Sequence, residues 1–275
     1  MNSQTPIIFF VSVLNEETRI ESLLRSIDPY ASFIVVFDSG CVDSTIERVK
    51  QFQKVRVIVP TSSVFEPRER FQRIMLDLNR DFPGYWAFPI GCSELLPTSL
   101  GDKLFRLVRS GGDKYDAINF YRQSYTWGVP SHRRKLVYLI EILLKKSNVR
   151  VFKPGSVNWD ASRIHREFPL KDEAKIMNLW PTNRLSLIHN REGFIEDFEE
   201  KHTAYSSREA YERVMGGDSG SLARLVARPL FSFLYFLPAA LLDRRALIVA
   251  IYHAFYKFQV EAKVLLWRHT RDSVK

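Results

Sequence analysis

The sequence predicts an α/β protein built on a doubly wound, mostly parallel sheet with helices on both faces. Two observations lead to this class. The first half of the chain carries short apolar runs that are continuous rather than alternating, which indicates strands buried on both faces. Segments with the 3.6-residue spacing of an amphipathic helix lie between these runs, as in other sheets of this type.

The elements of the first half follow in order along the chain. Ile7 to Leu14 is an apolar run rich in β-branched and aromatic residues, and Thr18 to Ile27 has its apolar residues on one helical face. Ligands of such sheets bind at the carboxyl ends of the strands. The elements expected next are a strand from Phe33 to Phe37, a helix from Ser44 to Gln53, a strand from Val55 to Val59, a helix from Pro67 to Asn79 and a strand from Trp86 to Ile90.

The second half is expected to complete the sheet and then turn helical. Its expected strands are Ala117 to Arg122, Val149 to Phe152 and Leu185 to His189, with a helix from Leu136 to Lys146. From about Phe194 the composition is that of helices. We therefore expect an α/β domain over residues 1–193 and a helical region over residues 194–275.

The net charge restricts the expected classes of binding partner, and the cysteine content restricts the expected cellular compartment. The formal net charge of +9 favours an anionic partner. Zinc-ligand spacing and RNA-binding motifs are missing, so nucleic acid is not expected, and lipid head groups or sugar diphosphates fit better. Cys41 and Cys92 cannot form a disulfide framework, which favours a reducing compartment. The short apolar run near the N-terminus has no basic residues ahead of it, which argues against a signal peptide and for the cytoplasm.

The expected strand ends carry motifs of a known family. The run from Val11 to Glu17 ends in Asn15-Glu16-Glu17, and the run from Val35 to Thr45 contains Asp38-Ser39-Gly40. These runs resemble the start of family 2 glycosyltransferases, whose first strand ends in Asn-Glu-Glu and whose second ends in Asp-Ser-Gly-Ser-x-Asp-x-Thr. Residues 201–210 and 228–243 are similar to the lipopolysaccharide-core glucosyltransferase branch. The resemblance implies a GT-A fold and a nucleotide-sugar donor, with a UDP-sugar as the first candidate.

Several residues at these ends are candidates for binding the nucleotide sugar. Asp38 can accept hydrogen bonds from a nucleobase, and its alternative role is a turn or helix cap. Glu16 or Glu17 fits either a contact to ribose or base, or a solvated first helical turn that the helix dipole favours. Asp43 fits a helix N-cap better than a ligand contact. The binding set implied by the resemblance is Asn15, Glu17, Asp38, Gly40, Arg73 and Ser93.

The expected diphosphate site departs from the family. Arg73 offers a planar fork to a diphosphate, or pairs with a carboxylate four residues away, Glu69 or Asp77. The family's metal-binding Asp-x-Asp-Glu is Gly91-Cys92-Ser93-Glu94 here. Three explanations stay open: Mg²⁺ or Mn²⁺ is held weakly through Glu94, basic side chains replace the metal, or catalysis is lost.

An inverting transfer needs a general base for the acceptor hydroxyl. Asp160, His165 and Glu167 are the candidates, because the family often has His-Glu where this chain reads His165-Arg166-Glu167. The one-residue offset would turn the carboxylate of Glu167 to the opposite face of a strand. A solvated polar loop is the alternative for all three residues.

The C-terminal region points to a membrane surface. Pro229 to Leu242 and Ala246 to Tyr256 are apolar, rich in aromatic residues and flanked by cations, yet shorter than the ~20 residues that span a bilayer. Helices lying in the interface on the inner face of the cytoplasmic membrane fit this pattern, and core-packing or dimer-forming helices are the alternative.

Two functions are compatible with these features. The first is a glycosyltransferase that moves a sugar from a nucleotide sugar to a lipid-linked or lipopolysaccharide-type acceptor in envelope polysaccharide synthesis. The second is an inactive GT-A protein that serves as a binding partner or scaffold in such a pathway. Asn15-Glu16-Glu17 and Asp38 favour the first function, and the Gly91-Cys92-Ser93 replacement favours the second.

Overall fold

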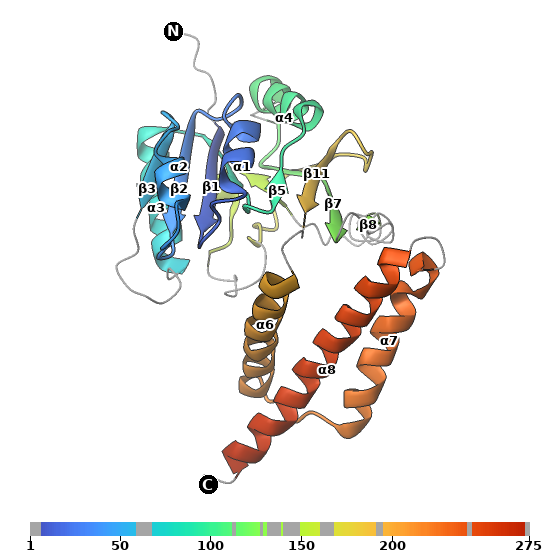
Figure 1. Ribbon diagram of the computed structural model, residues 1–275. Helices are drawn as coiled ribbons and strands as arrows, with labels where there is room; N and C mark the ends of the chain where they lie inside the picture. The colour runs from blue at the N-terminus through green and yellow to red at the C-terminus, as the bar shows by residue number, and fades with distance from the viewer. Residues whose placement is uncertain are drawn as a thin grey trace. The chain divides into compact units, whose positions relative to one another are not determined.

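The computed structural model describes residues 7–58, 68–111, 114–126, 129–130, 139, 149–159, 168–190, 195–240 and 244–272. The chain forms two compact units. The first consists of Met1–Ser124 and Ser131–Asn190, and the second of Tyr125–Pro130 and Arg191–Lys275. Figure 1 shows the sheet-containing unit in blue to yellow and the C-terminal helices in orange to red.

A seven-stranded sheet organises the first unit in the order β10-β6-β9-β4-β1-β2-β3. Neighbouring strands run parallel except at β9, which is antiparallel to both β4 and β6. The predicted α/β class with a mostly parallel sheet is confirmed (Figure 1). The strands are β1 (Ile7–Val13), β2 (Phe33–Asp38), β3 (Val55–Ile58), β4 (Trp86–Pro89), β6 (Ala117–Asn119), β9 (Val151–Phe152) and β10 (Ile176–Asn178).

Helices cover this sheet because its strands are apolar on both faces. In β1, Phe9 and Val11 pack into one core with helices α1 (Ile20–Ile27), α2 (Thr45–Val49) and α4 (Thr98–Gly111). The alternate residues Ile8 and Phe10 pack into a second core with α3 (Arg68–Asp81). Successive side chains of a strand point to opposite faces, so a continuous apolar run supplies both cores.

A second, four-stranded sheet has the order β5-β11-β7-β8. The expected strand Ala117 to Arg122 is divided at Phe120, and its second part, β7, joins this sheet. A continuous run of strand-forming residues does not reveal where a chain changes sheet, so the division could not be predicted. The expected helix from Leu136 to Lys146 lies outside the described residues except at Leu139. The strands are β5 (Glu94–Leu95), β7 (Tyr121–Thr126), β8 (Val129–Pro130) and β11 (Ser186–Asn190).

Helix α4 contacts Tyr30 at a glycine. A Cβ atom built on Gly101 would lie 2.2 Å from Cε2 of Tyr30. The ring is held in place, since its hydroxyl lies 3.0 Å from Oδ1 of Asp102 and 3.1 Å from the carbonyl oxygen of Thr98. The position is therefore restricted to glycine by packing and not by backbone conformation.

We expect Gly101→Ala to destabilise the protein by about 1–3 kcal/mol, because the new methyl group overlaps the ring. In a Tyr30→Ala background the same substitution should stabilise by up to ~1 kcal/mol, because alanine is the better helix former. Urea denaturation of the four proteins measures both effects. A stabilising Gly101→Ala in the presence of Tyr30 would contradict this account.

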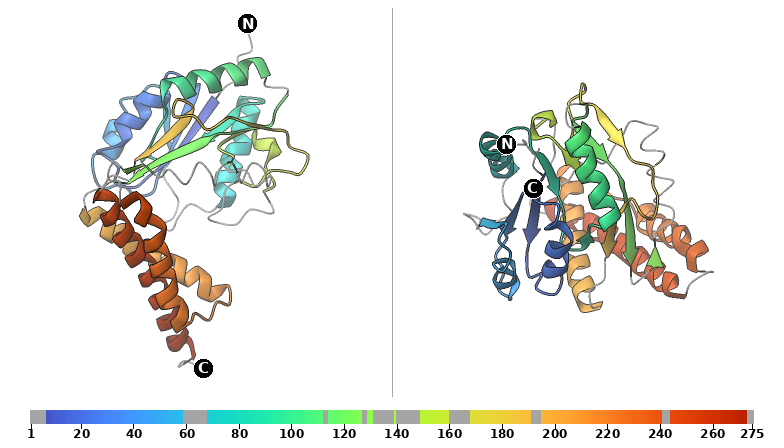
Figure 2. Two further views of the ribbon diagram at one scale, coloured as in Figure 1. Left: turned by 90° about the vertical axis from the view of Figure 1, so that its right-hand side faces the viewer. Right: turned by 90° about the horizontal axis from the view of Figure 1, so that it is seen from above.

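Three helices form the second unit: α6 (Ile195–Met215), α7 (Leu222–Ala240) and α8 (Arg244–Asp272). Helices α6 and α7 both pack along α8 (Figures 1 and 2). The predicted helical C-terminal region is confirmed. Among the described residues, no helix is long and apolar enough to cross a bilayer.

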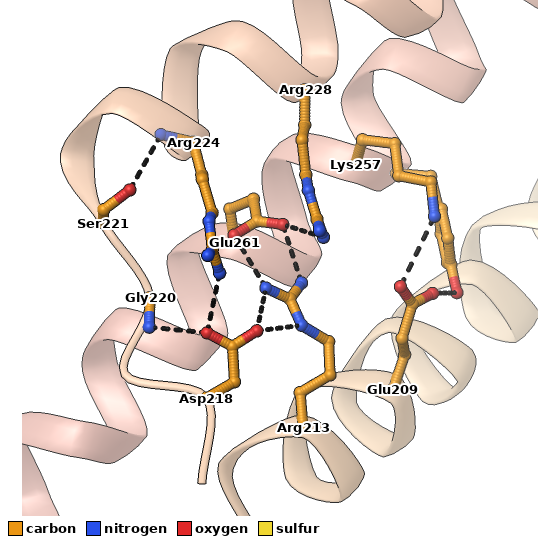
Figure 3. A network of polar contacts seen from close by, with 10 residues as sticks. Glu209, Arg213, Asp218, Gly220, Ser221, Arg224, Arg228, Lys257 and Glu261 are labelled. Carbon is orange, nitrogen blue, oxygen red and sulfur yellow. Dashed lines mark hydrogen bonds and ion pairs between the residues drawn. The ribbon is translucent and has the colours of Figure 1, made fainter. Parts of the chain in front are cut away.

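An ion-pair network around the buried carboxylate of Glu261 connects these helices (Figure 3). Glu261 on α8 is 0% exposed and accepts hydrogen bonds from Arg213 of α6, at 2.7 and 3.1 Å, and from Arg228 of α7, at 2.7 Å. Asp218 holds the other side of Arg213 and also binds Arg224 at 2.9 Å. Burial raises the pKa of Glu261, but the hydrogen bonds and charges of Arg213 and Arg228 outweigh it, so the pKa lies below its usual value.

Candidate functional site

The loops after β1 and β2 are bound to each other at the carboxyl edge of the large sheet. The two strands end in register, with Val13 opposite Asp38. Oδ1 of Asn15 accepts a hydrogen bond from the backbone N–H of Val42 at 2.9 Å, and Oε2 of Glu17 accepts one from Ser44 at 3.1 Å. Both of these side chains, predicted to bind the nucleotide sugar, thus hold the neighbouring loop in place.

Backbone groups of the first loop also donate hydrogen bonds to side chains of the second loop. The backbone N–H of Glu16 donates to Oγ1 of Thr45 at 2.7 Å, and that of Glu17 donates to Oδ2 of Asp43 at 3.1 Å. Oδ1 of Asp43 accepts from the backbone N–H of Thr45 at 3.0 Å, at the start of α2. Asn15 has the left-handed φ of 52°, which places its amide toward the second loop. Hydrogen bonds in both directions therefore join the two loops at this edge of the sheet.

Asp38 is the last residue of β2 and is fixed by the turn that follows it. Its Oδ1 accepts hydrogen bonds from the backbone N–H groups of Gly40 at 3.0 Å and Cys41 at 2.8 Å. Gly40 has φ of 99°, which only glycine adopts without strain. Burial raises the pKa of Asp38, but these hydrogen bonds outweigh it and hold the pKa below its usual value. Asp38 is thus an oriented carboxylate at neutral pH.

The loop after β4 lies at the same edge. Strand β4 is the other neighbour of β1, and the backbone N–H of Ile90 donates to the carbonyl of Phe10 at 2.9 Å. Cys92 is buried, with its Sγ 3.8 Å from the carbonyl oxygen of Ser12 near the end of β1. The carbonyl of half-buried Ser93 accepts from the backbone N–H of Asn190 at 2.8 Å. The three strand-end motifs singled out in the sequence therefore converge on one edge.

Glu94 ends this loop as a buried carboxylate between two arginines. Its Oε1 lies 3.1 Å from Nη1 of Arg122 and 2.9 Å from Nη1 of Arg150. Its Oε2 accepts from the backbone N–H of Gly91 at 2.9 Å and lies 3.3 Å from Nη1 of Arg150. Glu94 has 3% of its surface exposed, and its carboxylate is bound to two arginines of the protein.

These residues do not fit a divalent metal site. Mg²⁺ and Mn²⁺ prefer several oxygen ligands, and carboxylates above all. Both oxygens of Glu94 are already bound, and the remaining residues of the motif supply no second carboxylate. In the part of the chain that the structure describes, no group of three or more His, Cys, Asp or Glu residues could hold a metal ion.

The other predicted site residues stand apart from this edge or outside the description. Arg73 is exposed on α3, and the described contacts do not connect it to the loops after β1, β2 and β4. Asp77, an alternative partner for Arg73, pairs with Arg80 at 3.1 Å. The candidate bases Asp160, His165 and Glu167 lie outside the described residues, so their role stays a prediction.

The sequence reasoning did not identify Arg122 and Arg150 as site residues. Arg122 is the last residue of the expected strand Ala117 to Arg122, and Arg150 lies within the expected strand Val149 to Phe152, so neither was distinguished from ordinary strand residues. The available signal was the run Gly91-Cys92-Ser93-Glu94, which the resemblance aligns with a motif of two aspartates and a glutamate. A buried carboxylate such as that of Glu94 needs a positive partner, and the neighbouring residues Gly91, Cys92 and Ser93 cannot supply one.

The chain is similar to a named glycosyltransferase. No protein-family model matches it. The lipopolysaccharide core biosynthesis glycosyltransferase LpsC of Rhizobium meliloti (strain 1021) is 24% identical over 235 residues, which cover 85% of this chain and 81% of LpsC. The alignment therefore extends over most of both proteins.

Two solved structures give weaker similarity. Glucosyl-3-phosphoglycerate synthase from Mycobacterium tuberculosis, in complex with Mn²⁺, UDP and glucosyl-3-phosphoglycerate, has a TM-score of 0.44 and 15% identity over 74% of this chain and 78% of its own. A 4-diphosphocytidyl-2C-methyl-D-erythritol synthase has a TM-score of 0.41 and 12% identity over 65% of this chain and 90% of its own.

Proposed function

We propose that this chain is a GT-A glycosyltransferase that moves a sugar from a nucleotide sugar, with UDP as the carrier, to an acceptor at a membrane surface. The observation that carries the proposal is the fixed carboxylate of Asp38 beside the Asn15 loop, at the carboxyl edge where sheets of this class bind ligands. The similarity to LpsC, a named glycosyltransferase, supports the same reaction class.

Asp38 is suited to recognise the base of the donor. Backbone N–H groups of Gly40 and Cys41 both bind Oδ1 and so set the direction of the carboxylate, which the Cys41 thiol also contacts. A uracil ring carries an imide N–H, for which an ionised carboxylate is a strong acceptor. The loop clasp around Asn15 and Glu17 shapes the wall of this subsite, and this is the role that we assign to both residues.

The acceptor is proposed to be lipid-linked or part of a membrane glycan, because the second unit exposes a large apolar surface. Exposed apolar residues recur along one side of α7, including Val226, Leu230 and Phe231, the last of which is 75% exposed. Half-exposed cations accompany them, among them Arg224 and Arg228, which also pair with Asp218 and Glu261. An apolar helix face with cations at its border is typical of helices that lie in a lipid interface.

The proposed donor site is tested by Asp38→Asn. The amide keeps an oxygen for the N–H groups of Gly40 and Cys41, but it replaces the second carboxylate oxygen with a donor. We expect UDP affinity to fall about 10- to 100-fold, because a hydrogen bond to a charged group is lost and the base faces a like donor. Titration calorimetry with UDP measures the change, and Asp77→Asn on the exposed surface of α3 is the matched control. Unchanged affinity in Asp38→Asn would contradict the assignment.

An inactive scaffold is the second candidate, favoured by the replacement of the metal-binding aspartates with Gly91 and Ser93. The two functions differ in whether the protein transfers sugar from a UDP-sugar. A transferase should move labelled sugar from a UDP-sugar to lipid-extractable material in the presence of membranes. At limiting donor, Asp38→Asn should slow that transfer about 10- to 100-fold, in line with its weaker binding. Binding of UDP without any transfer or hydrolysis would favour the scaffold.

A further inference from the structure

The cluster of Glu94, Arg122 and Arg150 carries more positive than negative charge. One carboxylate faces two guanidinium groups, at 3.1 and 2.9 Å, so the three side chains together carry about one net positive charge. The side chains of Arg122 and Arg150 are 30% and 23% exposed, whereas that of Glu94 is 4% exposed. The negative carboxylate of the cluster is therefore buried, whereas its two guanidinium-bearing side chains reach solvent.

The cluster lies at the edge of the sheet that holds Asp38. Glu94 follows the carboxyl end of β4, and Arg122 lies in β7, three residues after the end of β6. Arg150 precedes β9, which runs antiparallel to β4 and β6, so its start is level with their carboxyl ends. Three elements thus direct their charged residues to one place.

The sheet order sets the spacing between this cluster and Asp38. Strands β4, β1 and β2 are successive neighbours, so the end of β4, which leads to Glu94, is two strand spacings, about 10 Å, from the end of β2. Strands β9 and β6, which carry the chain to Arg150 and Arg122, lie one and two spacings beyond β4, and both arginine side chains reach back to Glu94. A ribose separates a nucleobase from its diphosphate over a distance of the same order. A nucleotide with its base at Asp38 would therefore place its diphosphate near the end of β4.

We propose that Arg122 and Arg150, positioned by Glu94, bind the donor's diphosphate and take the place of a divalent cation. This inference rests on the proposed function and adds a binding site to it. Guanidinium groups match phosphate oxygens with paired N–H donors in a planar fork. Glu94 is then a positioning residue: it holds the two arginines, and the arginines act in place of the metal ion.

The two arginines would also act in the transfer step. As the acceptor hydroxyl oxygen bonds to the anomeric carbon, the bond from that carbon to the diphosphate breaks, and its electron pair stays on the diphosphate oxygen. The hydroxyl proton passes to a general base. Fixed positive charge next to the leaving oxygen stabilises the charge that develops there.

The test compares UDP with uridine, each titrated calorimetrically into the full-length protein in EDTA and in Mn²⁺. We expect the wild type to bind UDP equally well under both conditions. Arg122→Gln and Arg150→Gln should each weaken UDP binding at least about 10-fold and change uridine binding less than about 2-fold, because only UDP carries the diphosphate. Arg25→Gln, which removes an exposed arginine on α1, is the control.

The variant Arg122→Lys distinguishes a loss of UDP binding from a loss of folding, should the glutamine variants unfold. Lysine keeps the charge beside Glu94 but loses the planar fork, so UDP affinity should fall several-fold in a protein that unfolds at the wild-type temperature. Arginine variants that bind UDP as the wild type does, or a strict requirement for Mn²⁺, would overturn this inference and leave the proposed function standing. A wild type that binds neither UDP nor uridine would overturn both.

Discussion

Replacing Glu261 with alanine is expected to lower the free energy of unfolding of the helical unit by about 3 kcal/mol. The carboxylate is fully buried and binds Arg213 and Arg228, which belong to two other helices. Its removal takes a counter-charge from Arg213, whose side chain is largely buried, and breaking a buried ion pair from one side is strongly destabilising. Arg213 keeps Asp218 as a partner, so the loss should stay near the lower end of the usual range.

Urea denaturation followed by helical circular dichroism measures this change, since urea does not screen charges as guanidinium does. Glu212→Ala is the matched control, because Glu212 forms an exposed pair with Arg208 on the same helix, worth about 0.3–0.5 kcal/mol. Hydrogen exchange should show the loss of protection in α6, α7 and α8. Equal stability of the Glu261 and Glu212 variants would contradict a structural role for the network in Figure 3.

The same network predicts how stability depends on pH. The pKa values of Glu261 and Asp218 are both held below their usual values of 4.5 and 3.8. For Glu261 the arginines outweigh burial, and for Asp218 the hydrogen bonds from Gly220 and Arg213 are the main causes. A carboxylate with a lowered folded pKa stabilises the protein above its unfolded pKa. That stabilisation should be lost as the pH falls below about 4, and the loss should be smaller in Glu261→Ala.

The fold could be predicted because its signals are local. Continuous apolar runs such as Ile7 to Leu14 are visible in the sequence, and a run buried on both faces requires helices on both faces. The convergence of Asn15, Asp38 and Ser93 on one edge follows from the parallel order of the strands that precede them. The division of Ala117 to Arg122 between two sheets is decided by packing across the domain, and no local pattern marks it.

The partners of individual side chains could not be predicted, because they come from distant parts of the chain. Asn15 and Glu17 bind a loop 27 residues away, and Glu94 binds arginines 28 and 56 residues away. Strand-end motifs identify where a ligand site lies, but not which of its residues contact ligand and which contact one another. The sequence predicted only that Glu94 stands without aspartates beside it, whereas the structure shows that Arg122 and Arg150 are its partners.

The second large effect is expected on lipid binding. Leu222, Val226, Leu230 and Leu234 are exposed and recur every four residues on α7, which places them on one face, with Phe231 beside them. Helix α8 adds exposed apolar residues of its own, among them Ile251, Phe255 and Phe258. Burying one such side chain in the acyl boundary contributes about 1.5–3 kcal/mol when burial is complete. Replacing Leu230 and Phe231 with serine should therefore weaken vesicle binding at least about tenfold.

Sedimentation with phosphatidylcholine vesicles, with and without phosphatidylglycerol, measures this effect on the full-length protein. Anionic lipid should strengthen wild-type binding, because a Lys or Arg near the surface contributes about 1 kcal/mol. Met215→Ser, at the end of α6, removes an exposed apolar residue from the same unit and should bind as the wild type does. If the serine variant instead dissociates a dimer and leaves vesicle binding unchanged, the face is a contact between two copies of the chain. The proposal of a membrane-bound acceptor would then lose its structural support.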